Sequence, residues 1–336
     1  MKKNNDHTAI SKWINSIEKG QIRGLSQAIT LLESTRVEDQ NRARNLLEEA
    51  LKRLNKTGPT PTIRIGISGP PGVGKSSYIE SLGMHLLSLG FRVCVLAVDP
   101  SSRVSGGSIL GDKTRMERLS TQVNAFIRPS PSQQVLGGVT HATQSIMSLC
   151  ELAGYTVILI ETVGIGQSEG AVVDMVDCFV LLNQPGSGDE LQGIKRGILE
   201  FADILLVNKM DGATKYLAQQ TLQSLRSTSQ LINHPLKNYQ VPIIGVSSIE
   251  DTGISESWQA ITKFLQQATS IGYFEHKRQL QQEQWFIKAS EFYWLQYLHS
   301  AKHSTSLKNT LLKEIQSGKI SILEAAQGLT RSLLNN

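Results

Sequence analysis

The 336-residue sequence is poor in cysteine, poor in aromatic residues and free of long hydrophobic runs. It contains three cysteines, Cys94, Cys150 and Cys178, and no two of them form a CxxC pair. We therefore expect neither a disulfide framework nor a cysteine-rich zinc site, and a reducing compartment suits the chain. The longest apolar runs, such as residues 157–160, fall far short of the ~20 residues that span a bilayer. These absences predict a protein that is neither disulfide-stabilised nor embedded in a membrane.

The chain also lacks a strong charge of either sign. Lysine and arginine number 34 against 29 aspartates and glutamates, which leaves a net charge of +5. This mild excess requires no nucleic acid as a partner and suits an anionic small molecule at least as well. The first ten residues carry no apolar run, so we expect no secretory signal. Asp6 is present and no arginine precedes Arg23, which argues against a transit peptide and makes the cytoplasm the expected location.

Hydrophobic residues make up 40% of the chain and charged residues 19%, so the chain has enough apolar material for a packed core. Apolar residues recur at helical spacing in residues 8–56, which predicts two or three short helices, and a proline-containing break follows at 57–61. The tail is again helical and rich in aromatic residues, a pattern typical of a core or a subunit contact. We expect a helical N-terminal extension (1–58), a central domain (59–269) and a helical C-terminal arm (270–336).

In the central part, short aliphatic and β-branched runs alternate with helical stretches. The predicted strands are 62–68, 92–98, 123–128, 155–161, 177–183, 203–208 and 241–246. The predicted helices are 75–89, 136–153, 191–200, 214–231 and 255–269. The strands lack polar alternation, so burial on both faces is expected. The sequence therefore predicts an α/β fold with a mostly parallel central sheet flanked by helices, and such sheets bind nucleotides at the carboxyl ends of their strands.

The most specific motif follows the first predicted strand. It matches G-x-x-x-x-G-K-[ST] and reads Gly69-Pro70-Pro71-Gly72-Val73-Gly74-Lys75-Ser76, with Ser77 in the helix behind it. Glycines let backbone N–H groups turn inward around phosphate oxygens, and the helix N-terminus adds partial positive charge. Lys75 is expected to reach the β- and γ-phosphates, and Ser76 to ligate Mg²⁺. The strand before the motif and the helix after it indicate a P-loop NTPase.

A second motif indicates which base is bound. Asn208-Lys209-Met210-Asp211 ends an apolar strand and matches N-K-x-D. The Asp211 carboxylate can accept hydrogen bonds from guanine N1–H and N2–H₂, which adenine does not present. Asn208 is expected to contact the base edge, and the stem of Lys209 to cover the ring. Ser247 and Ser248 follow the next strand, where a backbone N–H is expected near guanine O6. The two motifs together predict bound GTP or GDP.

Three acidic residues are candidates for the metal and for the attacking water. Glu161 ends a strand in the sequence E-x-x-G and is expected to hold Mg²⁺ directly or through water, with the Gly164 N–H sensing the γ-phosphate. Asp99 ends another strand and Asp112 precedes a helical stretch, and either can serve Mg²⁺ or the attacking water. Each of the three can instead be a helix cap. No glutamine directly follows Gly164, because Gln167 comes three residues later.

Eight segments together resemble one family, the GTPases associated with methylmalonyl-CoA mutase (ArgK/MeaB type), to which the human methylmalonic aciduria type A protein is related. The segments are 69–77, 97–102, 105–117, 128–140, 161–169, 174–177, 185–203 and 207–212. The resemblance implies a homodimeric GTPase chaperone whose C-terminal arm dimerises. Its implied partner is an adenosylcobalamin-dependent acyl-CoA mutase, with a cobalamin adenosyltransferase as a further candidate. The chain itself is not expected to hold cobalamin.

Matching positions extend the resemblance to single residues. The implied phosphate, metal, nucleophile-side and guanine residues are Lys75, Ser76, Asp99, Asp112, Glu161, Asn208 and Asp211. Residues 184–196 match a mobile switch that responds to the mutase, and Lys195 matches a lysine that can enter the site in the complex. The chain departs from the family at Asn183-Gln184, where hydrophobic residues are commoner, and at residues 140–142, where basic residues are commoner. These departures do not affect the expected GTP hydrolysis. They do weaken the inference about which partner the protein binds.

Three other functions fit parts of the sequence. A metallochaperone GTPase for nickel enzymes shares the P-loop class, but the seven histidines and three cysteines are scattered. A kinase of a transport-binding protein is permitted by the P-loop, whereas N-K-x-D argues against ATP. A non-hydrolysing binding module is disfavoured because Lys75, Ser76, Asp99 and Glu161 are all present. The favoured hypothesis is a Mg²⁺-dependent GTPase with slow basal turnover that a partner accelerates.

Overall fold

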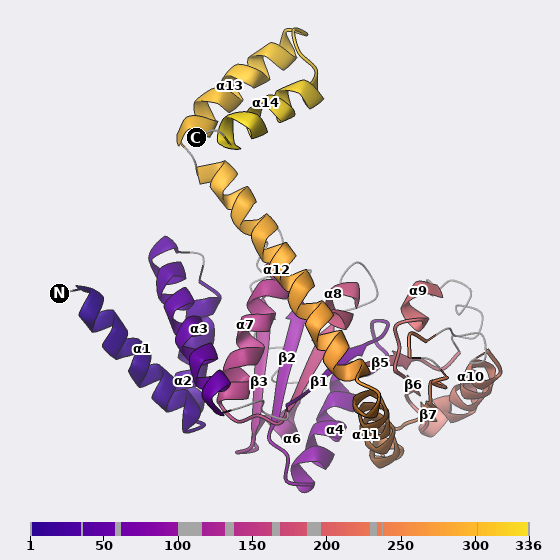
Figure 1. Cartoon of the computed structure of the whole chain (residues 1–336). Helices are drawn as coiled ribbons and strands as arrows, with labels where there is room; N and C mark the ends of the chain where they lie inside the picture. The colour runs from indigo at the N-terminus through magenta and orange to yellow at the C-terminus, as the bar shows by residue number, and fades with distance from the viewer. Residues whose placement is uncertain are drawn as a thin grey trace. The chain divides into compact units, whose positions relative to one another are not determined.

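In the part of the chain that the structure describes, seven strands form the central sheet in the order β3-β2-β4-β1-β5-β6-β7, and every pairing between neighbours is parallel (Figure 1). The computed structural model describes residues 2–34, 36–57, 62–99, 116–131, 138–162, 169–186, 196–228, 234–236, 238–300 and 302–334. The strands are β1 (Ile63–Ser68), β2 (Val93–Asp99), β3 (Ala125–Pro131), β4 (Val157–Thr162), β5 (Cys178–Asn183), β6 (Ile204–Val207) and β7 (Ile243–Gly245). The predicted α/β fold is confirmed, and each predicted strand is present with small shifts at its ends.

The sheet is buried on both faces, as the unalternating strand sequences predict. Every residue of β4, β5 and β6 is buried. On one face, α4 (Lys75–Ser88) and α11 (Ile254–Ser270) pack against alternate residues of β1 such as Ile65 and Ile67. On the other face, α8 (Glu169–Val173) lies over the intervening Gly66, and α7 (Gly138–Leu152) packs against β2. Because these strands pair in parallel, the carboxyl ends of β1, β4, β5 and β6 lie along one side of the sheet.

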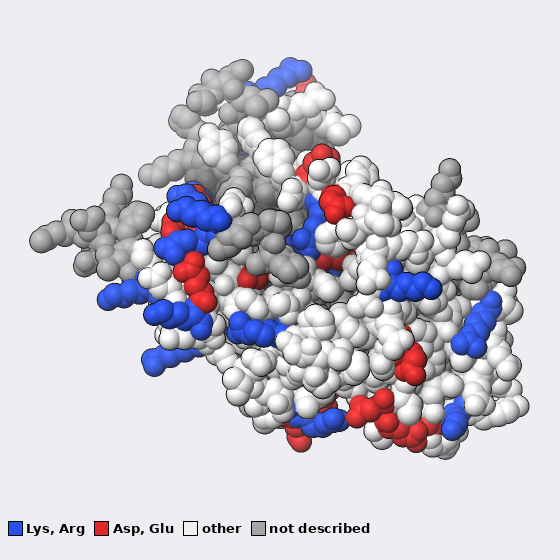
Figure 2. All heavy atoms as spheres, turned by 60° about the horizontal axis from the view of Figure 1, so that its bottom comes forward, with Lys and Arg blue, Asp and Glu red and all other residues white. Residues whose placement is uncertain are grey.

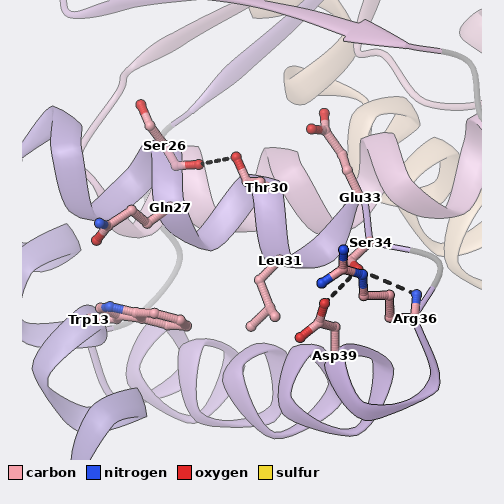
Figure 3. A pocket seen from close by; sticks show the side chains of 9 residues that line it. All are labelled: Trp13, Ser26, Gln27, Thr30, Leu31, Glu33, Ser34, Arg36 and Asp39. Carbon is pink, nitrogen blue, oxygen red and sulfur yellow. Dashed lines mark hydrogen bonds between the residues drawn. The ribbon is translucent and has the colours of Figure 1, made fainter.

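The N-terminal helices α1 (Lys2–Glu18), α2 (Ile22–Leu32) and α3 (Val37–Thr57) pack on one another and each contacts α7. Arg128 of β3 forms an ion pair with Glu33 at the end of α2. A hollow of about 720 Å³ opens beside the three helices. Figure 3 shows Leu31 extending from α2 toward the side on which Trp13 and Asp39 lie. The residues that line this hollow include acidic and basic side chains but none from the P-loop, so the hollow is not the candidate nucleotide site.

The remaining described elements are α6 (Glu117–Ser120), α9 (Arg196–Leu199), the short 3₁₀ helix η2 (Gly212–Thr214), α10 (Lys215–Thr228), α12 (Tyr273–Ser300), α13 (Lys302–Gln316) and α14 (Ile322–Leu334). Contacts divide the chain into two compact units, residues 1–281 and 282–336. The predicted boundaries at 58 and 269 stay predictions. Among the described helices, none has both the length and the apolarity needed to cross a membrane. On the face shown in Figure 2, basic and acidic side chains are interspersed around broad uncharged areas.

Two aspartates at the amino ends of β5 and β6 bind basic side chains in the first turns of α12. Asp177, just before β5, accepts hydrogen bonds from the backbone N–H of Arg64 at 2.8 Å and from Arg278 Nε and Nη2 at 2.9 and 2.8 Å. Asp203, just before β6, lies 3.7 Å from Lys277 Nζ. Burial opposes the charge on Lys277, but the Asp203 carboxylate together with Tyr273, Cys178 and Asp177 outweighs this effect and raises the pKa of the lysine. Both carboxylates are buried and compensated, as buried charges require.

Candidate active site

The loop between β1 and α4 depends on glycine at two positions. Gly69 has φ +154°, and a Cβ there would lie 2.5 Å from the carbonyl oxygen of Leu182 in β5. Gly74 has φ +93°, and a Cβ there would lie 2.6 Å from Asn208 Nδ2. L-residues rarely adopt such dihedrals, and neither position has space for a side chain. Among the described residues no side chain caps α4, so its first N–H groups remain available to an anion.

Lys75 folds back over this loop from the first turn of α4. Its Nζ donates hydrogen bonds to the carbonyl oxygens of Gly69 at 2.8 Å and Pro70 at 3.2 Å. The residue is 8% exposed, and burial lowers the pKa of its ammonium group, although the Glu161 carboxylate acts in the opposite direction. The positive charge therefore sits in the mouth of the loop, close to the N-terminus of α4. Burial removes water that would otherwise stabilise the charged ammonium group, and an anion bound there would stabilise that charge instead.

Ser76 meets Glu161 beside the loop. Ser76 Oγ donates a hydrogen bond to Glu161 Oε1 at 2.9 Å, and Glu161 is 8% exposed near the end of β4. The next residue, Thr162, donates from its Oγ1 to Ser68 Oγ at 2.8 Å and so joins the ends of β4 and β1. A hydroxyl and a carboxylate at this separation provide the hard oxygen donors that Mg²⁺ prefers. These two side chains therefore fit a magnesium ion.

The N-K-x-D segment is hydrogen-bonded to the P-loop. Asn208, which is buried, donates from Nδ2 to the carbonyl oxygens of Val73 at 2.9 Å and Gly74 at 3.4 Å. Its Oδ1 accepts a hydrogen bond from Ser248 Oγ at 3.1 Å. The next residue, Lys209, has φ +62°, a left-handed conformation that turns the chain sharply at the end of β6. The two predicted motifs, about 135 residues apart, therefore form one connected site.

The loop after β7 completes this side of the site. Ser247 Oγ donates a hydrogen bond to Asp211 Oδ2 and accepts one from the backbone N–H of Glu250 at 3.0 Å. Ser247 also exchanges backbone hydrogen bonds with Thr252, at 3.0 and 3.1 Å, which closes the loop. Asp211 is partly exposed, so its carboxylate can also reach a ligand. The predicted Ser247 and Ser248 thus lie against the predicted Asp211 and Asn208.

The comparison with known families agrees with this geometry. The family described as methylmalonyl Co-A mutase-associated GTPase MeaB matches residues 25–302. The chain belongs to this family. A MeaB-family chain with this P-loop fold is a GTP hydrolase, and its site is built for a guanine nucleotide.

Individual relatives extend this picture. A probable GTPase of Mycobacterium tuberculosis (Rv1496) is 43% identical over 97% of this chain and 96% of its own length. The mouse protein named methylmalonic aciduria type A homolog, mitochondrial, is 46% identical over 82% of this chain and 68% of its own length. A crystal structure described as LAO/AO transport system kinase superposes with a TM-score of 0.73 at 31% identity, covering 97% of this chain and 98% of that one.

Several residues predicted for the MeaB-family site cannot be placed. Asp112, Gly164 and Lys195 lie outside the described residues. Asp99 ends β2, where Ala97 pairs with Glu161 and Val98 with Thr162, so its backbone is near the Ser76–Glu161 pair. The described part of the predicted helix 191–200 contains α9.

Two residues near the site were missed by the sequence analysis. Thr162 links the ends of β1 and β4, and Ser81 of α4 contacts the loop after β7. Ser81 is a small polar residue on the buried side of α4, which also includes Tyr78, Ile79, Leu82 and Leu86. A polar interruption of an apolar helix face signals a hydroxyl that needs a specific partner. That signal was available in the sequence, but the identity of the partner was not.

Proposed function

We propose that this GTPase is a chaperone of an adenosylcobalamin-dependent acyl-CoA mutase, with methylmalonyl-CoA mutase as the first candidate. GTP binding and hydrolysis would gate the loading of cofactor and protect or reactivate the mutase. The observation that carries this proposal is the family match over residues 25–302, which spans the P-loop, the N-K-x-D segment and the switch segment 184–196. The family's own description names the mutase association. The cysteine-poor composition favours the cytoplasm.

The phosphate groups of GTP bind at the P-loop. The ammonium group of Lys75 exchanges its carbonyl partners at Gly69 and Pro70 for β- and γ-phosphate oxygens. Backbone N–H groups of residues 72–77 turn around the same oxygens, since Pro70 and Pro71 have none to donate, and the positive end of α4 adds to the attraction. The Lys75 ammonium group, the backbone N–H groups and the N-terminus of α4 all carry full or partial positive charge before the nucleotide binds. Phosphate binding therefore needs little reorganisation of the loop.

Two oxygen-bearing side chains beside the P-loop would hold the metal ion. Ser76 Oγ and Glu161 Oε1, 2.9 Å apart, would hold Mg²⁺, with Asp99 as a further ligand or as the residue that orients water. A magnesium ion held there would supply positive charge that stabilises the charge on the phosphate groups. Asp112 is the alternative residue for orienting water, and the Gly164 N–H senses the γ-phosphate. Ser76 and Glu161 keep the donor oxygens in place before nucleotide binds.

The base binds between Asp211 and the loop that follows β7. Asp211 accepts the guanine N1–H and N2–H₂ protons, the stem of Lys209 covers the ring, and a backbone N–H near Ser247 or Ser248 donates to O6. Asn208 contacts the base edge while its amide group keeps the P-loop in register. This arrangement selects guanine because adenine offers no donor pattern that matches the carboxylate of Asp211.

Hydrolysis proceeds by in-line attack of water on the γ-phosphorus. The bond from phosphorus to the β–γ bridging oxygen breaks, GDP leaves, and the proton of the water ends on phosphate. Positioning and charge stabilisation supply most of the rate enhancement. No glutamine directly follows Gly164, so basal turnover is slow and the mutase accelerates it. Lys195, within the switch segment 184–196, is the residue that would enter the site in that complex.

The protein acts as a homodimer through its C-terminal arm. Exposed aromatic side chains gather in residues 282–336, with Phe286 73% exposed and Trp294 52% exposed. Tyr293 and Tyr297 are about half exposed as well. Large apolar side chains grouped on one helix are costly to leave in water and are typical of subunit contacts. A cobalamin adenosyltransferase is a further partner for the same chaperone cycle.

GTP hydrolysis with and without purified methylmalonyl-CoA mutase tests the proposal at fixed Mg²⁺, with ATP as the nucleotide control. We expect turnover of GTP, and not of ATP, to rise severalfold with the mutase. Lys75→Ala should abolish productive nucleotide binding and leave the fold largely intact. GTP turnover that no mutase changes would refute the chaperone role and keep the hydrolase. Transfer of labelled γ-phosphate to another protein would instead favour a kinase, the activity for which the solved relative is named.

A further inference from the structure

Helix α4 contacts the base side of the site as well as the phosphate side. Ser81 lies on its buried face and is 4% exposed. Its Oγ donates a hydrogen bond of 2.8 Å to the carbonyl oxygen of Ser248, in the loop after β7. Lys75 and Ser76 lie in the first turn of the same helix. One rigid element therefore carries the phosphate-contacting residues and also holds the loop expected to contact guanine.

The bond from Ser81 fixes the direction of a peptide group. The C=O and N–H of a trans peptide point to opposite sides, so a carbonyl held on α4 directs the following N–H, that of Ile249, away from α4. The preceding peptide is fixed in the same way, because the carbonyl oxygen of Ser247 accepts from the N–H of Thr252 at 3.1 Å. Ser248 Oγ is meanwhile bound to Asn208. The two peptide groups on either side of Ser248 thus have set orientations.

A second hydroxyl on the same helix face makes a different contact. Tyr78 OH donates to Ser257 Oγ at 2.9 Å, and Ser257 belongs to α11, which follows the loop. Tyr78 and Ser81 are three residues apart, so they project from one face of α4. Both hydroxyls are buried and bonded, but only Ser81 reaches the loop itself. The chain therefore contains a natural control: a buried hydrogen bond of α4 that does not hold the base loop.

We infer that Ser81 is a positioning residue for guanine recognition. It sets the loop after β7 at a fixed separation from the P-loop, so that the phosphate and base contacts can form on one nucleotide. This inference rests on the proposed nucleotide site. Its ligand class is a purine nucleotide whose base accepts a hydrogen bond at O6. Loss of the Ser81 hydroxyl should weaken base binding and leave the hydrolytic step, which involves Lys75, Ser76 and Glu161, almost unchanged.

Ser81→Ala and the control Tyr78→Phe test this inference in the full-length protein. GDP and ADP affinities would be measured by titration, and kcat and KM for GTP by phosphate release. For Ser81→Ala we expect a GDP Kd about three- to tenfold higher, which corresponds to the free energy that one buried hydrogen bond contributes. The ADP Kd should change less, so the preference for guanine falls, and kcat should stay within about twofold. Tyr78→Phe should lower stability and leave the ratio of GDP to ADP affinity unchanged.

Several outcomes would overturn the inference. One is a folded Ser81→Ala protein with unchanged GDP affinity, and another is a lower kcat at unchanged KM. An equal loss of guanine preference in Tyr78→Phe would show a general effect of α4 stability. If Ser81→Ala does not fold, Ser81→Cys retains the size with a weaker donor, and its GDP Kd should rise while its ADP Kd does not. Wild-type protein that binds no GDP would refute the proposed site, a result distinct from failure of the Ser81 variant alone.

Discussion

Replacing Gly69 by alanine should disable nucleotide binding through a steric effect that can be worked out from the structure. The new Cβ would lie 2.5 Å from the carbonyl oxygen of Leu182. Carbon–oxygen contacts of this kind normally lie at about 3.3 Å or more, so one partner must move by about 0.8 Å. Leu182 lies within β5, which is paired on both sides in the centre of the sheet, so it cannot give way. The P-loop must move instead.

A displacement of this size matters because phosphate binding depends on aligned N–H groups. Misplacement by ~1 Å can cost a factor of about 100 where several groups act on one ligand. The φ of +154° adds ~1–3 kcal/mol of backbone strain for alanine. We therefore expect the GDP affinity of Gly69→Ala to fall by about 100-fold or more. Titration with a fluorescent GDP analogue would measure this fall, with circular dichroism to confirm the fold.

Gly90→Ala is the matched control for backbone strain alone. Gly90 has φ +86°, and no other described heavy atom lies within 4 Å of its Cβ position. Alanine there should cost ~1–2 kcal/mol of unfolding free energy from the left-handed conformation and leave GDP affinity unchanged. The steric reasoning is wrong if Gly69→Ala binds GDP as tightly as the wild type, or if both variants weaken binding equally.

Two further predictions concern the base and the amino edge of the sheet. Asp211→Asn should reduce the preference for guanine nucleotides, because the amide offers one acceptor where the carboxylate offers two; an unchanged ratio of GDP to ADP affinity would remove Asp211 from base recognition. Arg278→Met should lower the free energy of unfolding by ~3–5 kcal/mol, because it leaves the carboxylate of Asp177, 2% exposed, with the N–H of Arg64 as its one hydrogen-bond donor among the described residues. Urea unfolding would measure this loss, and a decrease below ~1 kcal/mol would contradict it.

The fold could be predicted from the sequence because each strand corresponds to a short contiguous run of apolar residues. Uninterrupted short runs such as residues 178–182, rich in β-branched and aliphatic residues, favour a strand covered on both faces, and such strands are typical of a parallel sheet between helices. The P-loop and the N-K-x-D segment were likewise readable because each is contiguous. The ends of the strands were less well defined, since pairing partners decide where a strand stops.

What the sequence could not provide is the set of contacts between distant segments. Asn208 was expected at the base edge, and its bonds to Val73 and Ser248 join parts of the chain that no local pattern relates. Ser81 is invisible as a site residue until α4 and the loop after β7 are brought together. Both contacts are hydrogen bonds of small polar side chains to main-chain or side-chain oxygens. Their partners are chosen by the packing of the helices on the sheet, which sequence periodicity does not specify.

Contacts that stabilise the fold lie at the amino ends of β5 and β6, whereas the residues expected to recognise nucleotide follow their carboxyl ends. Stability and nucleotide recognition can therefore be tested separately. β5 and β6 begin beside Asp177 and Asp203, whose carboxylates hold Lys277 and Arg278 of α12. The same two strands precede the predicted switch segment (184–196) and the N-K-x-D segment. The contacts to α12 therefore lie at the opposite end of these strands from the residues expected to contact nucleotide. Arg278→Met should therefore lower stability without changing GDP affinity, whereas Gly69→Ala should lower GDP affinity by about 100-fold or more and cost only the ~1–3 kcal/mol of backbone strain in stability. A parallel loss of both properties in Arg278→Met would show that the two edges are coupled through the sheet.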